Sequence, residues 1–372
     1  MRVSVPTIIT GSGAPKQTIS PAAAVERIAD FLAPGKATLL TGAGVSVASG
    51  IRAYRGKDGR YMNPNYQPIL YHELTDQSEK GFAFRQRYWY EFKSCSQSAR
   101  LMFYRLRSYL GYPPVRDALP NTSHYAIAAL QYASYLPRLV TQNVDGLHHK
   151  AIAHLWEPDH IQKQMLELHG TLHRVHCKRG HIVPRDMFQD WLSSSNPQWK
   201  AFVDNLEKTG QKPRTNPDGD VELEGVSYAD FVVPECPQCT LEGQQNSFHK
   251  PEVIFFGESI PSRIKDRSFH DIEQSERVFV LGTTLATYSA FRLVKRALEL
   301  RKPVMLLNVG PTRADGLPGV EKLEISSSLV LRDVVRALLG SRASQDSAIV
   351  YLLQSGIHQP PAEDHKIISR NT

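Results

Sequence analysis

The segment Gln142-Asn143-Val144-Asp145 places three hydrogen-bonding side chains within four residues, and an imidazole follows at His169. Such side chains destabilise a fold if they are buried without partners, so they are either exposed or matched to a ligand. A carboxylate suits the N–H₂ group of a carboxamide, and an asparagine suits a water molecule or a ribose hydroxyl. Histidine is the side chain best suited to proton transfer near neutral pH, although a single histidine more often has a structural role.

A glycine-rich turn offers a second kind of chemistry. It reads Gly42-Ala43-Gly44-Val45-Ser46. Glycine lets the backbone approach a pyrophosphate, and the start of a helix supplies free N–H groups and a favourable dipole. The next glycine, Gly50, is out of register for the usual dinucleotide fingerprint, and a glycine turn can equally serve packing alone. Asn308 likewise has two interpretations, as a ribose contact or as a turn residue before Gly310.

The cysteines indicate a metal rather than disulfides. Four cysteines are too few for a disulfide scaffold in a chain of 372 residues. Two of them, Cys236 and Cys239, form a Cys-x-x-Cys pair, which is typical of a metal site in a reducing compartment. The alternative is that the pair is simply two small buried residues in a turn.

Four short apolar stretches, typical of buried strands, each end in a polar or glycine-rich loop. They span residues 37–40, 136–141, 277–281 and 303–307. Stretches with helical periodicity lie between them, at 22–32, 123–132 and 290–300. This alternation is typical of a parallel α/β sheet. Because ligands bind beyond the carboxyl ends of such strands, we expect the four loops to meet in one crevice.

Composition narrows the class of protein. With 41% hydrophobic and 22% charged residues, the chain is an ordinary globular protein. No apolar run approaches the roughly 20 residues that span a bilayer, which argues against a membrane protein. The net charge of +7 favours anionic ligands, but the basic residues are spread along the chain and do not indicate nucleic acid. The sequence does not indicate an oligomeric state.

The alternation of strands and helices stops between roughly residues 174 and 250, which we interpret as a small inserted domain. Residues 21–173 and 251–340 would then form the larger domain. Residues 341–372 become polar and lose periodicity, so we expect a loosely attached tail. Residues 1–20 contain basic but no acidic side chains, which fits either a mitochondrial targeting segment or a frayed terminus.

In their order and spacing, these motifs resemble the sirtuin family over roughly residues 20–340. The matching segments are TGAGVSVASGIRAYRG, TQNVDGLHHKA, ELHG, CPQC, PEVIFFGE, VLGTTL and LLNVGPTRAD. The segments RQRYW, NPDGDVEL and NVGPTRAD are similar to class II sirtuins, which include mitochondrial members. The resemblance implies a Rossmann-like parallel sheet with a smaller inserted zinc-binding domain. It also implies NAD-dependent removal of acyl groups from protein lysines, with release of nicotinamide and acyl-ADP-ribose.

The resemblance further implies a role for each motif. His169 would be the general base that deprotonates a ribose hydroxyl of NAD, Asn143 would hold that ribose or a water, and Asp145 would bind the nicotinamide carboxamide. The full set implied for NAD is Gly42, Ala43, Gly44, Val45, Ser46, Ala53, Tyr54, Arg55, Gln142, Asn143, Asp145, Gly282, Thr283, Thr284, Asn308, Val309 and Gly310. An acylated lysine peptide would be the partner, held in a tunnel formed by Val253, Phe256 and Gly257.

The sequence departs from the family at the expected zinc site and at the lid. The family has two Cys-x-x-Cys pairs, but Cys177 is followed by KRGH, so Gly180 stands where a cysteine is expected. His181 would complete a Cys₃His set, which zinc accepts readily; His176 as ligand, a three-ligand site and no metal are the alternatives. In the lid, which we expect over residues 52–74, Arg52 and Ala53 replace the family's proline and aspartate, and Arg52 either meets an anionic group or points into solvent.

Three functions remain open at this point. Lysine deacylation is the leading one, and mono-ADP-ribosyl transfer to proteins breaks the same bond but uses another acceptor. A degenerate NAD-binding scaffold is the third, although a pure binder has no need of a base such as His169. The acyl chain and the protein substrate are not indicated. The mitochondrial matrix is the expected compartment, with the cytoplasm or nucleus as alternatives.

Overall fold

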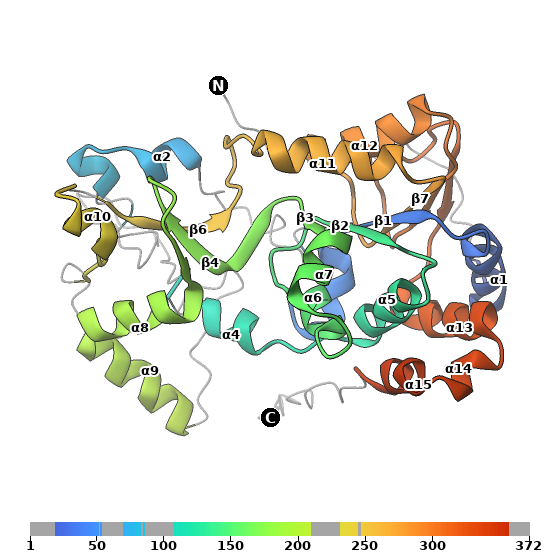
Figure 1. Ribbon diagram of the computed structural model, residues 1–372, viewed down its shortest axis with the longest axis horizontal. Coiled ribbons are helices and arrows are strands. Elements are labelled where there is room, and N and C mark those ends of the chain that lie inside the picture. The colour runs from blue at the N-terminus through green and yellow to red at the C-terminus, as the bar shows by residue number, and fades with distance from the viewer. Residues whose placement is uncertain are drawn as a thin grey trace, which may run out of the picture.

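A six-stranded parallel sheet forms the larger part of the computed structural model, on the right in Figure 1. The structure describes residues 19–51, 53, 70–82, 85, 108–109, 111–209, 231–244 and 247–356. In sheet order, the strands are β3 (Met165–Glu167), β2 (Arg138–Thr141), β1 (Ala37–Thr41), β7 (Arg277–Leu281), β8 (Val304–Leu307) and β9 (Val320–Leu323). The four expected strands are confirmed as the middle of this sheet, and the α/β class is correct.

Helices cover both faces of the sheet. Successive strand residues point to opposite faces, and because they are apolar in both directions, each face must be covered. Leu39 packs into a cluster with α1 (Pro21–Leu32), α5 (Thr122–Tyr132), α13 (Ser327–Leu339) and α15 (Ser347–Gln354). Its neighbour Leu40 packs into a second cluster with α11 (Ser262–Glu273) and α12 (Tyr288–Glu299). The strands are therefore buried on both sides, and polar side chains of the sheet collect at its ends.

The order of the strands reverses next to β1. From β1 the chain continues to β2 and β3 on one side, whereas β7, β8 and β9 are added on the other side. Such a switch point separates the loops that follow β1 and β7, and it is where open parallel sheets bind ligands. The short elements near it are η1 (Ala43–Ser49), α2 (Tyr71–Thr75), α4 (Tyr112–Asp117), α6 (Leu147–Ile152) and α7 (Pro158–Gln164).

A second, antiparallel sheet of three strands lies at the other end of the molecule (Figure 1). Its strands are β5 (Ile182–Pro184), β4 (Gly170–Cys177) and β6 (His249–Val253), accompanied by α8 (Arg185–Ser195), α9 (Pro197–Thr209) and α10 (Pro237–Leu241). Phe188, Trp199 and Phe231 are buried in its separate core. This sheet begins before residue 174 and ends after residue 250, so the expected insert was drawn a few residues too short.

The expectation of a loosely attached tail after residue 340 is wrong for residues 341–356. They form α14 (Arg342–Gln345) and α15, which packs against α5. Ile349 and Leu352 are fully buried, and the Asp346 side chain caps α15 by accepting from the N–H of Ala348. The i, i+3 spacing of these apolar residues is helical, and both lie in a short apolar run, residues 348–353, between polar segments. Residues 357–372 lie outside the described part, and no described helix is long and apolar enough to cross a membrane.

Candidate functional site

The loops after β1 and β7 interlock at the switch point through glycines. The N–H of Gly42 donates to Leu281 O at 3.1 Å, and that of Gly44 donates to Gly282 O at 2.8 Å. A Cβ atom at Gly44 would lie 2.7 Å from Gly282 O, and Gly282 itself has a φ of +60°. A side chain at either position would push the loops apart. The turn thus has a packing role, and any phosphate bound here would need donors other than these two N–H groups.

Ser46 joins the two buried polar side chains that follow β2. Its hydroxyl donates to Asp145 Oδ2 at 2.7 Å and accepts from Asn143 Nδ2 at 3.1 Å. Asn143 Nδ2 also donates to Gly42 O at 3.1 Å, and Asp145 Oδ1 accepts from the N–H of Leu147 at 3.0 Å. Burial raises the pKa of Asp145, while these hydrogen bonds oppose that rise. The sequence placed Ser46 only among phosphate contacts and missed its role between Asn143 and Asp145.

Gln142 links all three loops at this edge of the sheet. Its Nε2 donates to Thr41 O at 3.1 Å and to Thr283 Oγ1 at 3.0 Å, and its Oε1 accepts from Thr287 Oγ1 at 3.2 Å. Thr283 Oγ1 in turn accepts from the N–H of Leu285 at 3.1 Å. The ends of β1, β2 and β7 therefore meet here, which are three of the four strand ends that were expected to share one crevice.

His169 lies beside this network and is half-buried. It has a hydrogen bond to the Gln142 backbone, and its Nε2 lies 2.7 Å from Ser289 Oγ at the start of α12. The pKa of His169 is lowered to about 4, mainly by burial; the hydrogen bond to Gln142 opposes this shift and the positive charge of Arg292 contributes to it. The imidazole is therefore neutral at pH 7 and free to accept a proton.

The segment expected to hold the acyl-lysine follows β6. Val253 pairs with Gly170, and Phe256 O accepts from the N–H of Tyr71 at 2.9 Å, which ties this segment to α2. Gly257 has a φ of +83°, a conformation that favours glycine. These residues therefore form a loop that is held in place by backbone hydrogen bonds. It lies next to β4, which begins directly after His169.

The residues expected to hold the adenosine half lie after β7 and β8. Asn308 is buried, and its Nδ2 donates to Val309 O at 3.0 Å and to Gly310 O at 3.2 Å, so it organises its own turn. Val309 is 67% exposed. The O of Thr284 accepts from the N–H of Arg313 at 2.9 Å. Of the lid residues, Ala53 is half-buried, whereas Tyr54 and Arg55 lie outside the described residues.

Four potential metal ligands converge where β4, β5 and α10 meet: Cys177, His181, Cys236 and Cys239. Their ligand atoms all lie within 4.8 Å of one another. His181 Nδ1 lies 3.4 Å from Cys177 Sγ, 3.5 Å from Cys236 Sγ and 3.4 Å from Cys239 Sγ. Such spacing suits a tetrahedral zinc ion with about 2.0–2.3 Å bonds. His176, the alternative ligand, instead directs Nδ1 to Cys177 O at 3.1 Å.

A family model described as the Sir2 family matches residues 42–289 of the chain. The chain belongs to the Sir2 family. This sirtuin is 39% identical over 319 residues to the NAD-dependent protein deacylase SIR4 of Batrachochytrium dendrobatidis, which covers 84% of this chain and 93% of that protein. It is 32% identical to the NAD-dependent protein deacylase Sirt4 of Drosophila melanogaster, over 86% of this chain and 88% of that protein.

Solved structures agree with this fold. A mutant Sir2 homologue in complex with ADP-ribose superposes with a TM-score of 0.57. The match covers 86% of this sirtuin and 98% of that chain, at 23% sequence identity. At that identity the likeness establishes the architecture and nothing about individual residues.

Two buried histidines behind the site of this sirtuin were not singled out from the sequence. The rings of His124 and His148 lie 4.8 Å apart between centroids. His124 Nε2 lies 3.4 Å from Ser46 Oγ, and His148 Nε2 lies 3.1 Å from Thr41 Oγ1. Burial lowers the pKa of His124 to about 3, so it stays neutral. The Asn121-x-x-His124 helix cap was the available signal, since both side chains bond across that cap.

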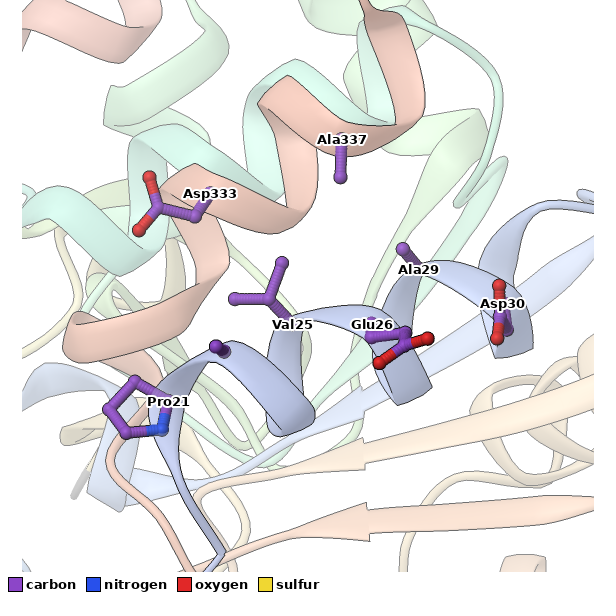
Figure 2. A pocket seen from close by; sticks show the side chains of 8 residues that line it. Pro21, Val25, Glu26, Ala29, Asp30, Asp333 and Ala337 are labelled. Atoms are coloured by element: carbon purple, nitrogen blue, oxygen red, sulfur yellow. The ribbon is translucent and has the colours of Figure 1, made fainter.

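A groove of about 640 Å³ between α1 and α13 lies apart from these strand ends. Figure 2 shows Glu26 and Asp30 on α1, and Asp333 on α13, along it. Its other lining residues are Pro21, Ala22, Val25, Ala29 and Ala337. Its lining offers no imidazole, thiol or hydroxyl, in contrast to the side chains at the switch point.

Proposed function

We propose that this protein removes acyl groups from lysines of other proteins and consumes NAD in doing so. The main support is the buried hydrogen-bond network of Asn143, Ser46 and Asp145, which lies beside a neutral His169. This network lies at the switch point of the sheet, in a chain of the Sir2 family. The names of the relatives, NAD-dependent protein deacylases, support the same activity. A carboxylate accepts hydrogen bonds and an amide oxygen does too, so these two side chains suit the donors of a carboxamide and of a ribose.

NAD contributes a glycosidic bond to nicotinamide, whose cleavage leaves a ribose carbon open to attack by the acyl oxygen. In this proposal Asp145 accepts from the carboxamide and Asn143 orients the ribose. His169 would then take a proton from a ribose hydroxyl, which activates that oxygen toward the acyl carbon. One water molecule is consumed as the bond between the acyl carbon and the lysine nitrogen breaks, which releases the lysine amine and leaves the acyl group on ADP-ribose. The segment of Val253, Phe256 and Gly257 holds the acyl-lysine, with backbone groups available to an extended peptide.

The decisive experiment measures nicotinamide release with acetyl-, succinyl-, glutaryl-, lipoyl- and long-chain acyl-lysine peptides. Mass spectrometry of the NAD product identifies the acceptor. Acyl-ADP-ribose that accumulates with at least one peptide supports deacylation. ADP-ribosylated protein without acyl-ADP-ribose would replace it with the transferase function, and no product from any peptide would leave only the NAD-binding scaffold.

We also propose that one structural zinc ion is bound by Cys177, His181, Cys236 and Cys239, and that the protein works in the mitochondrial matrix. The clustered ligands support the first proposal. The second is supported by the basic, acid-free residues 1–20 and by relatives that carry the name Sirt4 or SIR4. Microscopy of the protein fused at its C-terminus to a fluorescent protein, with and without residues 1–20, tests the compartment; staining outside mitochondria in both cases would contradict it.

A further inference from the structure

A basic groove lies between α11 and α12, which run side by side along one face of the large sheet (Figure 1). Its volume is about 500 Å³. Four cationic and two acidic side chains line it, together with Phe269 and Tyr288: Lys265, Arg292, Lys295, Arg296, Glu273 and Glu299. The groove therefore carries an excess of positive charge.

Arg296 forms ion pairs with both acidic residues of the groove. Arg296 Nη2 lies 2.6 Å from Glu273 Oε1, and Arg296 Nη1 lies 3.5 Å from Glu299 Oε2. Within the described residues, Lys265, Arg292 and Lys295 form no ion pair. Both lysines are exposed to solvent. Three positive charges along one groove are thus available to an anionic ligand.

Arg292 is the most distinctive of the three. Its Nε and Nη2 atoms are buried and have no hydrogen-bond partner among the described residues, although its guanidinium lies 5.1 Å from the centroid of the Phe269 ring. Arginine donors left unpaired on burial destabilise a protein unless a ligand pairs with them. A carboxylate matches the forked geometry of a guanidinium and can accept two parallel hydrogen bonds. Because Arg292 Nε and Nη2 are covered in the free protein, neighbouring side chains of the groove must move for a carboxylate to reach them.

The groove is also connected to the reaction site. Arg292 follows Ser289 by one turn of α12, and Ser289 Oγ lies 2.7 Å from His169 Nε2. The charge of Arg292 reaches His169 and lowers its pKa. A substrate whose lysine is placed next to His169 would therefore have neighbouring residues within reach of this groove.

We propose that the α11–α12 groove binds acidic side chains of the protein substrate that flank the acylated lysine, with Arg292 as its innermost contact. This inference rests on the proposed deacylase function. The ligand is a carboxylate, and its source is assigned to the peptide because the groove is open: Tyr288 is 60% exposed, and both lysines face solvent. A carboxylate at the end of an acyl chain would instead lie in the segment around Val253 and Phe256.

The test compares kcat/KM for acetyl-lysine peptides whose flanking residues are Glu or, in the matched peptide, Gln. A third peptide carries succinyl-lysine in the Gln context. The enzymes are the full chain, Arg292→Gln, the Lys265→Gln/Lys295→Gln double variant and Lys208→Gln as an exposed control on α9. We expect the unmodified protein to prefer the Glu peptide by about fivefold at low salt, with the preference falling as ionic strength rises.

Arg292→Gln and the double variant should each reduce that preference toward one, mainly through KM, while Lys208→Gln keeps it. The double variant lies away from His169 and should retain kcat on the Gln peptide, which separates lost recognition from lost catalysis. An unchanged preference in both variants, or a loss confined to the succinyl peptide, would overturn the proposal. If no peptide released nicotinamide, the deacylase function itself would be wrong, a result distinct from turnover without charge preference.

Discussion

Ser46 Oγ donates a hydrogen bond to Asp145 Oδ2 over 2.7 Å, from the first turn after β1 to the loop after β2. The same oxygen accepts from Asn143, so one hydroxyl fixes both side chains that we assign to NAD. Because Ser46 is fully buried, no water can replace it without rearrangement. The relative position of Asn143 and Asp145 thus depends on a residue that belongs to another strand's loop.

Ser46→Ala should therefore impair both stability and catalysis. It leaves a buried carboxylate and a buried amide each short of one partner, which typically lowers the free energy of unfolding by about 1–3 kcal/mol. We expect kcat to fall by about tenfold or more as Asn143 and Asp145 lose their positions. Denaturant unfolding and nicotinamide release measure the two effects. Ser344→Ala, in exposed α14, is the control, and a Ser46→Ala protein with the control's kcat would refute this role.

His169→Ala should remove most turnover while NAD still binds. General-base assistance is typically worth about 10²–10⁴ in rate. Because the pKa of His169 is lowered to about 4, the base is neutral from about pH 5 upward, and kcat should fall on the acid side only near pH 4–5 rather than near 6.5. A pH profile of kcat and NAD titration calorimetry test this. His270→Ala, on the exposed side of α11, serves as the control; near-normal turnover of His169→Ala would rule the assignment out.

His181→Ala should release the zinc ion that we propose. The wild-type chain is expected to hold one zinc per molecule, and removal of the only imidazole among the four clustered ligands leaves three thiolates. Since structural zinc contributes on the order of 10 kcal/mol in small metal domains, the three-stranded sheet should loosen. Elemental analysis and thermal unfolding measure both consequences. His176→Ala is the matched control. If His181→Ala kept the zinc and His176→Ala lost it, His176 rather than His181 would be the fourth ligand.

Glu167 should make the protein less stable as the pH rises. Its pKa is raised to about 7, mainly by burial; Arg174 opposes this shift and Glu252 contributes to it. A carboxyl whose pKa is raised in the folded state contributes stability below its unfolded pKa near 4.5, and that stability is lost as pH rises through 7. In the unmodified protein, the free energy of unfolding should therefore fall by on the order of 2 kcal/mol between pH 5 and 8. Glu167→Gln should abolish this slope. Urea unfolding at both pH values tests it; an unchanged slope, as expected for exposed Glu79→Gln, would contradict it.

Most of the fold was predictable because its signals are local. The apolar stretches around Leu39, Leu139, Phe279 and Leu306 each lead into a polar loop, and parallel pairing follows from the intervening helices. The capping Asp346 and the spacing of Ile349 and Leu352 were equally local. They were overlooked because the apolar run that holds Ile349 and Leu352, residues 348–353, is short and lies between polar segments.

The site was only partly predictable because its contacts are not local. The sequence identified Asn143, Asp145 and His169 by type, yet not that Ser46 joins the first two. No sequence pattern indicates that Arg292 lies near His169, because the two are distant in the chain. They are connected by Ser289, at the start of α12, which contacts His169. Residue types indicate chemistry, and the pairing of distant loops decides which side chains carry it out.

Lys250 and Glu258 form a buried ion pair that holds the segment assigned to the acyl-lysine. Lys250 Nζ lies 3.1 Å from Glu258 Oε1 and donates to Val253 O at 3.0 Å, and Glu258 Oε2 accepts from the N–H of Phe255 at 2.9 Å. Glu258→Gln keeps an acceptor for Phe255 but leaves a buried ammonium without its counter-charge. It should lower the free energy of unfolding by about 3–5 kcal/mol and raise KM for the peptide more than it lowers kcat.

The Lys250→Met/Glu258→Gln double variant should recover part of that stability, because no unpaired charge remains, while KM stays high for lack of the bond to Val253 O. The exposed pair of Lys200 and Asp204 is the control: Lys200→Met should change the free energy of unfolding by less than about 1 kcal/mol and leave KM unaltered. A double variant with normal KM would mean that the pair stabilises the fold without shaping the peptide site. Peptide KM, rather than stability, is therefore the measurement that decides between these two roles.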